Sequence, residues 1–332
     1  MPFIAALHDL ELSLNNAELA CIPAAHGLLA SLIAHEHPIL LIATSSRRAS
    51  ELADEARSYL GDSSVAEFAP WETLPHERLS PKADTVASRF ATLHALANPQ
   101  HQIRVVVTSV RGLLQPIASD LLDIDLPQLE VGTEISLPAL AEHLSYLGFS
   151  RVDLVERRGD FAVRGGIVDL FPADFEHPIR IDFFGDEIEE IQFFTVADQR
   201  TFAPVTGVTT VYPCRELLLS PQVKERAGYI AAEFPQVAEI AHKIANGIST
   251  EGMESLQGLL KENLVSLVHY LPKNFSALVV DEPRVQSRAL DLINTNREFL
   301  EAAWSNAALG AATPIDLTDM AGGYFDLSLI HI

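Results

Sequence analysis

The feature that most constrains the fold is a change in hydrophobic pattern near residue 120. Before it, short apolar runs alternate with amphipathic stretches, which is typical of a parallel α/β sheet. We predict buried strands at 18–23, 38–44, 65–69 and 103–108, and helices at 26–35, 46–60 and 83–97. After about Leu126 the pattern differs, because one helix is followed by strands alone.

The middle of the chain predicts an antiparallel α+β module. Its helix, 137–147, has Ser136 as its N-cap and ends at Gly148. The strands are predicted at 161–163, 167–171, 179–184 and 188–194, with a tight turn at Gly185-Asp186. From about residue 206 helices return, together with one apolar strand at 277–280.

The simplest architecture is an α/β domain that is interrupted by a β-rich module and then completed. We place the first part of the α/β domain at 1–120, the inserted module at 121–205 and the second part at 206–326. The last six residues, 327–332, read Leu-Ser-Leu-Ile-His-Ile, which matches the translation of a transposase-end adapter used in DNA library preparation. We interpret them as a non-native tail and exclude them from the fold.

Charge and cysteine content narrow the classes of function. The 332 residues carry a formal net charge of −22, which disfavours tight, independent binding to the phosphate backbone of DNA. Cys21 and Cys214 show no Cys-x-x-Cys spacing, so we predict buried thiols in a reducing compartment. The N-terminus lacks the features of a signal peptide, and no run approaches the ~20 apolar residues of a membrane span. These observations predict a cytoplasmic protein without a membrane partner.

The strand at 179–184 places an aromatic ring and an arginine on one face. Side chains alternate along a strand, so Arg180, Asp182 and Phe184 are predicted to point outward while the intervening residues face the core. In the preceding strand, alternation directs Ala162 and Arg164 outward. Arginine and aromatic residues are favoured at protein-interface hot spots. The alternative is an ordinary solvated sheet face with one stray aromatic, and the pattern alone leaves both open.

An acidic pair near the end of the chain suggests nucleotide chemistry that the rest of the sequence does not support. Asp281-Glu282 follows an apolar strand, as in the motif that handles Mg²⁺ and water in nucleotide hydrolases. That chemistry also needs a phosphate cradle with a lysine, but no Gly-Lys-Ser/Thr occurs and Pro23 lacks a backbone donor at the expected junction. We therefore predict caps or surface charges at Asp281 and Glu282, and no ATP hydrolysis.

No other catalytic or metal-binding pattern is present. The twelve histidines lack the His-Glu-x-x-His spacing, and no Gly-x-Ser-x-Gly sequence occurs. We predict no catalytic residue, no metal site and no cofactor in this chain. The rival hypotheses are a nucleotide-dependent nucleic-acid enzyme fragment, related to an excinuclease protein or a helicase, and a DNA-binding module without chemistry.

Three sequence blocks carry a resemblance to a known family. They are Trp71-Glu72-Thr73-Leu74-Pro75 with Leu79-Ser80-Pro81 and Ser88-Arg89; 161–172, Phe-Ala-Val-Arg-Gly-Gly-Ile-Val-Asp-Leu-Phe-Pro, continuing to Gln199-Arg200-Thr201; and Tyr270-Leu271-Pro272 through Val280-Asp281-Glu282-Pro283. Together they resemble the transcription-repair coupling factors (Mfd), in the N-terminal module related to the excinuclease protein UvrB. The resemblance implies a degenerate P-loop-NTPase-like, UvrB-like fold, in which Asp281 and Glu282 are vestiges of an acidic motif.

The resemblance also implies a partner. In this family the inserted module binds UvrA, the damage-recognition protein of the excinuclease, through two arginines and a phenylalanine, which correspond to Arg164, Arg180 and Phe184. The implied function is recruitment of UvrA to RNA polymerase stalled at DNA lesions, in transcription-coupled nucleotide excision repair. RNA polymerase, DNA, ATP and Mg²⁺ would be bound by later domains that this sequence lacks.

Two departures separate the chain from UvrB: the phosphate-binding Gly-Lys-Thr is absent, and one loop differs. The role of three basic residues stays open. The tyrosine-rich hairpin that UvrB inserts into damaged DNA is replaced by the short loop 71–81, which has no tyrosine. Whether the basic residues Arg151, Arg157 and Arg158 contact DNA or only protein cannot be decided from the sequence.

Overall fold

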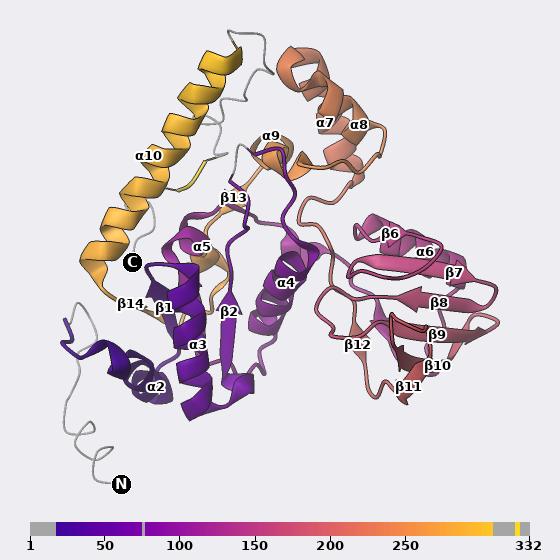
Figure 1. Ribbon diagram of the computed structural model, residues 1–332, viewed down its shortest axis with the longest axis horizontal. Coiled ribbons are helices and arrows are strands. Elements are labelled where there is room, and N and C mark those ends of the chain that lie inside the picture. The colour runs from indigo at the N-terminus through magenta and orange to yellow at the C-terminus, as the bar shows by residue number, and fades with distance from the viewer. Residues whose placement is uncertain (1–17, 75–76, 308–322, 326–332) are drawn as a thin grey trace.

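The computed structural model describes residues 18–74, 77–307 and 323–325 (Figure 1). The helices are α2 (His26–Glu36), α3 (Ser46–Leu60), α4 (Ala83–Ala97), α5 (Val110–Leu114), α6 (Leu137–Tyr146), α7 (Pro221–Glu233), α8 (Ala238–Ala245), α9 (Gln257–Leu260) and α10 (Glu282–Ala307). The longer strands are β1 (Ile39–Ala43), β2 (Val65–Phe68), β3 (Val105–Ser109), β7 (Asp160–Arg164), β8 (Ile167–Leu170), β9 (Ile179–Phe184), β10 (Glu187–Phe194), β11 (Thr201–Pro204) and β14 (Ser276–Val279). The two-residue strands are β4 (Ile117–Ala118), β5 (Gln128–Leu129), β6 (Ser150–Arg151), β12 (Thr209–Thr210) and β13 (Leu264–Val265).

A four-stranded parallel sheet forms the centre of the molecule, in the order β14-β1-β3-β2. Its strands come from both ends of the chain, because β14 pairs in parallel with β1 although more than two hundred residues separate them. Every residue of β1 and β3 is buried, as expected for central strands that have helices on both faces.

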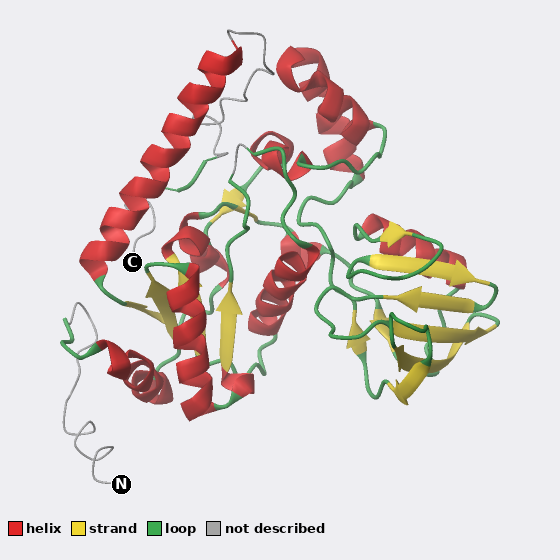
Figure 2. Ribbon diagram, in the orientation of Figure 1, coloured by secondary structure: helices red, strands yellow, loops and turns green. Residues whose placement is uncertain are grey.

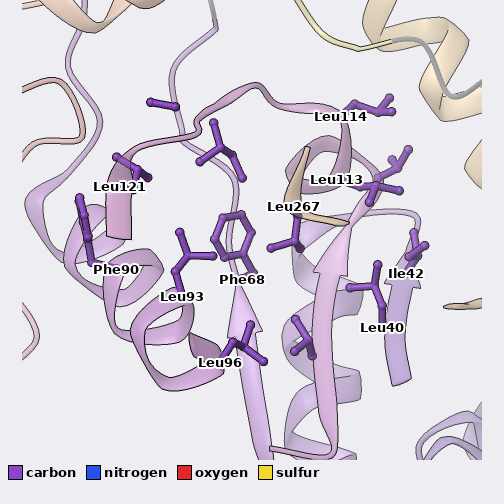
Figure 3. Packing of buried hydrophobic residues seen from close by; sticks show 14 of the residues in the cluster. Leu40, Ile42, Phe68, Phe90, Leu93, Leu96, Leu113, Leu114, Leu121 and Leu267 are labelled. Carbon is purple, nitrogen blue, oxygen red and sulfur yellow. The ribbon is translucent and has the colours of Figure 1, made fainter. Parts of the chain in front are cut away.

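Strand alternation divides this core into two layers. Ile39 and Leu41 pack on one face against α2 and α3, while Leu40 and Ile42 pack on the other against residues of α4, α5 and α10. In the second layer the ring of Phe68 lies among leucines of α4 and α5 (Figure 3). Burial of so many apolar side chains stabilises this sheet by the hydrophobic effect.

A six-stranded, mostly antiparallel sheet lies beside the parallel one, in the order β11-β10-β9-β8-β7-β6 (Figure 2). Only the short β6–β7 pair is parallel. Helix α6 packs on the inner face of this sheet, through Leu140 and Leu144. The hydroxyl of Ser136 accepts a hydrogen bond from the amide of Ala139, which caps α6, and Gly148 ends it with φ of +87°.

The chain enters and leaves the six-stranded sheet at one place. Strand β5, on the way in, pairs with β12, on the way out. The chain then forms the helical layer of α7, α8 and α9, which has its own apolar core, before it returns to the parallel sheet through β14. No helix in the described ranges is long and apolar enough to span a bilayer.

The α/β fold class is confirmed, and most predicted elements occur within two residues of their expected bounds. Helices α3 and α4 and strand β9 have the predicted bounds. The predicted strand at 18–23 is wrong, because 18–22 form no strand and Pro23–Ala25 begin a 3₁₀ turn that leads into α2. Cys214 is buried as predicted, but Cys21 is exposed beside that turn. The tail at 327–332 lies outside the described residues.

Candidate protein-docking face

The candidate site lies on the outer face of the six-stranded sheet, opposite α6. Alternation along β9 buries Ile179 and Ile181, so the intervening side chains stand on the outer face. Arg180, Asp182 and Phe184 follow one another along this face, as predicted. Arg164 joins them from the end of β7, two strands away in the sheet.

Phe184 is the most exposed large apolar side chain of this face, with an exposed fraction of 77%. It stands at the end of β9, where Gly185 has φ of +64° and turns the chain into β10. Exposure of this ring takes no side chain away from the core, because the neighbouring Phe183 points inward and packs there. The ring is therefore available to a partner.

Arg180 is held more firmly than the sequence suggested. Its side chain is 20% exposed, and its Nε and Nη2 donate to the two carboxylate oxygens of Asp169 at 2.6 and 2.9 Å. Its Nη1 donates to the backbone carbonyl of Gln199 at 3.2 Å. Its guanidinium carbon lies 5.0 Å from the centre of the Phe194 ring, within the range of a cation–π contact. The bond to Asp169 raises the pKa of Arg180 further.

Arg164 shares the same carboxylate but is more open to solvent. Its Nη2 lies 3.2 Å from Oδ2 of Asp169, and 46% of its side chain is exposed. Asp169 is itself 2% exposed, on β8 between the two arginine-bearing strands. Sequence reasoning missed Asp169 as a member of the site. The signal was a lone carboxylate at an outward position in an otherwise apolar strand.

Ala162 points outward from β7, as predicted, since it lies opposite Asp169 across the β7–β8 ladder. It is nevertheless 1% exposed, because Val155, Phe171 and Phe194 cover it. The part of the outer face around Ala162 is therefore covered, whereas Phe184 and Arg164, near the β9–β10 hairpin, are exposed. The two arginines lie at the border between the covered part and the open part.

The open part of the face carries acidic side chains. A shallow hollow of about 610 Å³ is lined by Ile167, Asp182, Glu189 and Glu190, among others. Asp182 pairs in register with Glu190 on β10. Partial burial, and then repulsion by Glu190, raises the pKa of Asp182, while Arg180 opposes the shift. The face thus combines two arginines, an aromatic ring and a carboxylate rim.

Of the neighbouring basic residues, Arg158 already has protein partners. Its Nε donates to the carbonyl of Phe175 at 2.8 Å, and its guanidinium carbon lies 5.9 Å from the centre of the Phe171 ring. Arg151 and Arg157 are exposed.

The junction where a nucleotide phosphate would be expected is filled by a carboxylate. The amide of Gly27, in the first turn of α2, donates to Oε2 of Glu55 at 3.0 Å. Arg48 donates to the other oxygen of Glu55 at 2.9 Å and to the carbonyl of Pro23 at 3.1 Å. A helix N-terminus favours an anion, and here the chain supplies its own. A phosphate at this position would meet the charge of Glu55.

The acidic pair after β14 has the surroundings of a helix start. Asp281 has φ of +60°, and its carbonyl accepts from the amides of Arg284 and Val285 in the first turn of α10. Its carboxylate lies 3.2 Å from Nε of Arg284. Glu282 is exposed at the first position of the helix. Within the described residues, no group of three or more histidine, cysteine or acidic side chains could hold a metal ion.

The loop after β2 is fixed by buried carboxylates at both ends. Trp71 donates from Nε1 to Glu216 at 2.9 Å, and Arg89 forms a buried ion pair with the same carboxylate. At the other end, the hydroxyl of Ser80 donates to Glu254 at 2.7 Å, and Arg215 donates to Glu254 at 2.8 Å. The described parts of this loop therefore lie against the body of the protein.

Comparison with known proteins identifies the family. A protein-family model described as the UvrB interaction domain matches residues 128–217, a range that contains Arg164, Arg180 and Phe184. Over 323 residues, 92% of this chain, the sequence is 43% identical to the transcription-repair-coupling factor of Mycobacterium tuberculosis (strain CDC 1551 / Oshkosh). The chain belongs to the transcription-repair-coupling factor family. It matches the N-terminal segment of these factors.

Two further relatives set the range of similarity. The transcription-repair-coupling factor of Escherichia coli (strain K12) is 32% identical over 262 residues, 76% of this chain. The UvrABC system protein B of Acaryochloris marina (strain MBIC 11017) is 26% identical over 217 residues, 62% of the chain. The chain spans 26% of the length of the mycobacterial transcription-repair-coupling factor and 22% of the Escherichia coli one.

Proposed function

We propose that this chain is a recruitment module that binds UvrA, the damage-recognition protein of the excinuclease, through the outer face of the six-stranded sheet. The observation that carries the proposal is the joint exposure of Phe184 and Arg164 beside the fixed guanidinium of Arg180. Exposed aromatic rings with neighbouring arginines are the residue types that dominate interface energies. The match to the UvrB interaction domain over the same residues supports this choice of partner.

In the complete factor, this module would bring UvrA to RNA polymerase stalled at a DNA lesion. We place the contacts with RNA polymerase and DNA, and the ATP-driven translocation, in the regions of the related factors that this chain does not match. The net charge of −22 supports this placement, since a strongly acidic surface opposes independent DNA binding.

Isothermal titration of purified UvrA into the 332-residue chain tests the docking proposal. Phe184→Ala and Arg164→Ala should each weaken binding by about tenfold or more, as hot-spot truncations do. The fold should be unaffected, because the ring of Phe184 is exposed and Arg180 keeps Asp169 paired when Arg164 is truncated. Matched controls are Tyr229→Ala, an exposed aromatic on α7, and Arg47→Ala, an exposed arginine on α3. Equal affinity for the wild type and both docking variants would refute the proposal.

We also propose that this chain itself is not catalytic and binds no nucleotide. The carboxylate of Glu55 at the start of α2 supports this, together with the absence of a Gly-Lys-Ser/Thr sequence. Titration with ATP and Mg²⁺ separates the recruiter from a nucleotide-dependent enzyme fragment. Saturable micromolar binding would favour the enzyme fragment.

A further inference from the structure

The three docking residues are not equivalent in the structure. Phe184 and Arg164 are open to solvent, whereas the guanidinium of Arg180 is bonded to Asp169 through two of its nitrogens and to Gln199 through the third. A guanidinium with three such bonds has little freedom to reorient. Two other residues therefore determine the position of Arg180.

Asp169 is the first of these residues. It lies opposite Arg180 across the β8–β9 ladder and opposite Ala162 across the β7–β8 ladder, so Arg164 reaches it along a diagonal. A carboxylate that is 2% exposed requires charged partners, and the two guanidiniums supply them. Since both arginines bind one carboxylate, their spacing on the outer face depends on Asp169.

Gln199 is the second residue that determines the position of Arg180. It adopts φ of +60°, an uncommon conformation for a residue with a side chain. Its side-chain amide donates to the carbonyls of Val196 at 2.9 Å and Val155 at 3.2 Å, and its own carbonyl accepts from Arg180. These bonds fix the turn between β10 and β11 against the segment before β7, and they hold the carbonyl of Gln199 beside the guanidinium.

We propose that Asp169 and Gln199 are positioning residues that hold the guanidiniums of Arg164 and Arg180 in the arrangement that the partner protein recognises. The inference rests on the proposed binding of UvrA. Asp169 acts through the arginines, since it is buried beneath them and a docked protein would meet the guanidiniums first.

A double-mutant cycle tests this role, with affinity for purified UvrA as the readout. Asp169→Asn keeps the shape of the side chain but removes its charge. In the wild-type background we expect this variant to bind UvrA about tenfold more weakly. We expect the same loss in a Phe184→Ala background. In an Arg164→Ala background the loss should shrink, because one of the two guanidiniums that Asp169 positions is gone while Arg180 still pairs with the buried carboxylate. A merely structural role would weaken binding by the same factor in all three backgrounds, and that result would overturn the proposal.

The remaining outcomes are also decisive. If the wild type does not bind, the proposed function itself fails; if Phe184→Ala weakens binding and Asp169→Asn does not, only the positioning role fails. Asp54→Asn, which removes a carboxylate from an exposed pair on α3, is the matched control and should bind like the wild type. Thermal unfolding of each variant reports the fold.

A second variant carries the test if Asp169→Asn does not fold. Gln199→Gly tolerates the positive φ and keeps the carbonyl, but it loses both amide bonds. It should weaken binding several-fold in the wild-type background and have no effect in an Arg180→Ala background, where Arg164 still pairs with Asp169. Unchanged affinity of Gln199→Gly in the wild type would contradict the role of this residue.

Discussion

Single side chains decide which chemistry each region of this protein can perform. At the start of α2, Glu55 occupies the place of an anion, and on the six-stranded sheet Asp169 binds two arginines. In both cases a carboxylate satisfies donors that would otherwise be open to a ligand. The difference is that Phe184 and much of Arg164 stay accessible beside Asp169. Of these two regions, the sheet face is the one where an aromatic ring and a guanidinium stay open to solvent.

Removal of Glu55 should leave the amide of Gly27 at the start of α2 without its acceptor, but it should not create a nucleotide site. Glu55→Ala takes an acceptor from the amide of Gly27 and a partner from Arg48, so we expect unfolding in urea to show a loss of about 1 kcal/mol. ATP binding should stay undetectable in titration, because no phosphate-binding lysine is present in the sequence of this junction. Micromolar ATP binding by this variant would show that Glu55 alone closes a working nucleotide site.

At the scale of elements, the outer face depends on the helix behind it. Helix α6 packs against the inner residues of the six-stranded sheet, including those that alternate with Arg180 and Phe184 on β9. Its start is fixed by Ser136 and its end by Gly148. The stability of α6 therefore supports a surface that the helix does not touch.

Loss of the cap should lower stability without altering the outer face. Ser136→Ala removes the side-chain acceptor of the Ala139 amide, which typically costs about 1 kcal/mol. Urea unfolding measures this loss, and Ser136→Asp, which retains a capping oxygen, is the control. Affinity for UvrA should remain at the wild-type value under native conditions.

At the scale of the whole molecule, buried charges connect parts that are distant in sequence. Glu216 joins Trp71 of the loop after β2 to Arg89 of α4, and Glu254 joins Ser80 of the same loop to Arg215. Arg215 and Glu216 come shortly after β12, where the chain leaves the six-stranded sheet. These contacts link that sheet to the parallel sheet and to the helical layer.

Removal of one partner of the buried pair should be strongly destabilising. Glu216→Ala leaves the guanidinium of Arg89 buried without its carboxylate, and such losses cost about 3–5 kcal/mol. The free energy of unfolding in urea is the measurement. Arg47→Ala, which removes one member of an exposed pair on α3, should change it by less than about 1 kcal/mol.

Glu254 predicts a specific dependence of stability on pH. Burial raises its pKa above the ordinary value of 4.5, while Arg215 and Ser80 oppose the shift. The folded state therefore holds this proton more tightly than the unfolded state does. The resulting stabilisation is fully present below about pH 4.5 and is lost as pH rises through the folded pKa.

The comparison with Glu254→Gln isolates this effect. Urea unfolding of both proteins should give similar stabilities in acid, with the Gln variant becoming the more stable one as pH rises. A wild type that is more stable than Glu254→Gln at about pH 7 would show that the ion pair with Arg215 outweighs the burial of the charge.

Hydrophobic period alone determined most elements and the direction of the side chains on β9, because both depend on neighbours within a few residues. The hydrophobic period could not determine which of the outward side chains on β7 and β9 stay accessible. Ala162 is covered by Phe194 and Val155, and Arg180 is bound by Asp169, through contacts that depend on strand register and on segments brought over the sheet. The anion at α2 came likewise from a separate helix. The direction in which a side chain points is a local property of the backbone. Its burial and its charge partners depend on the segments that the fold packs against it.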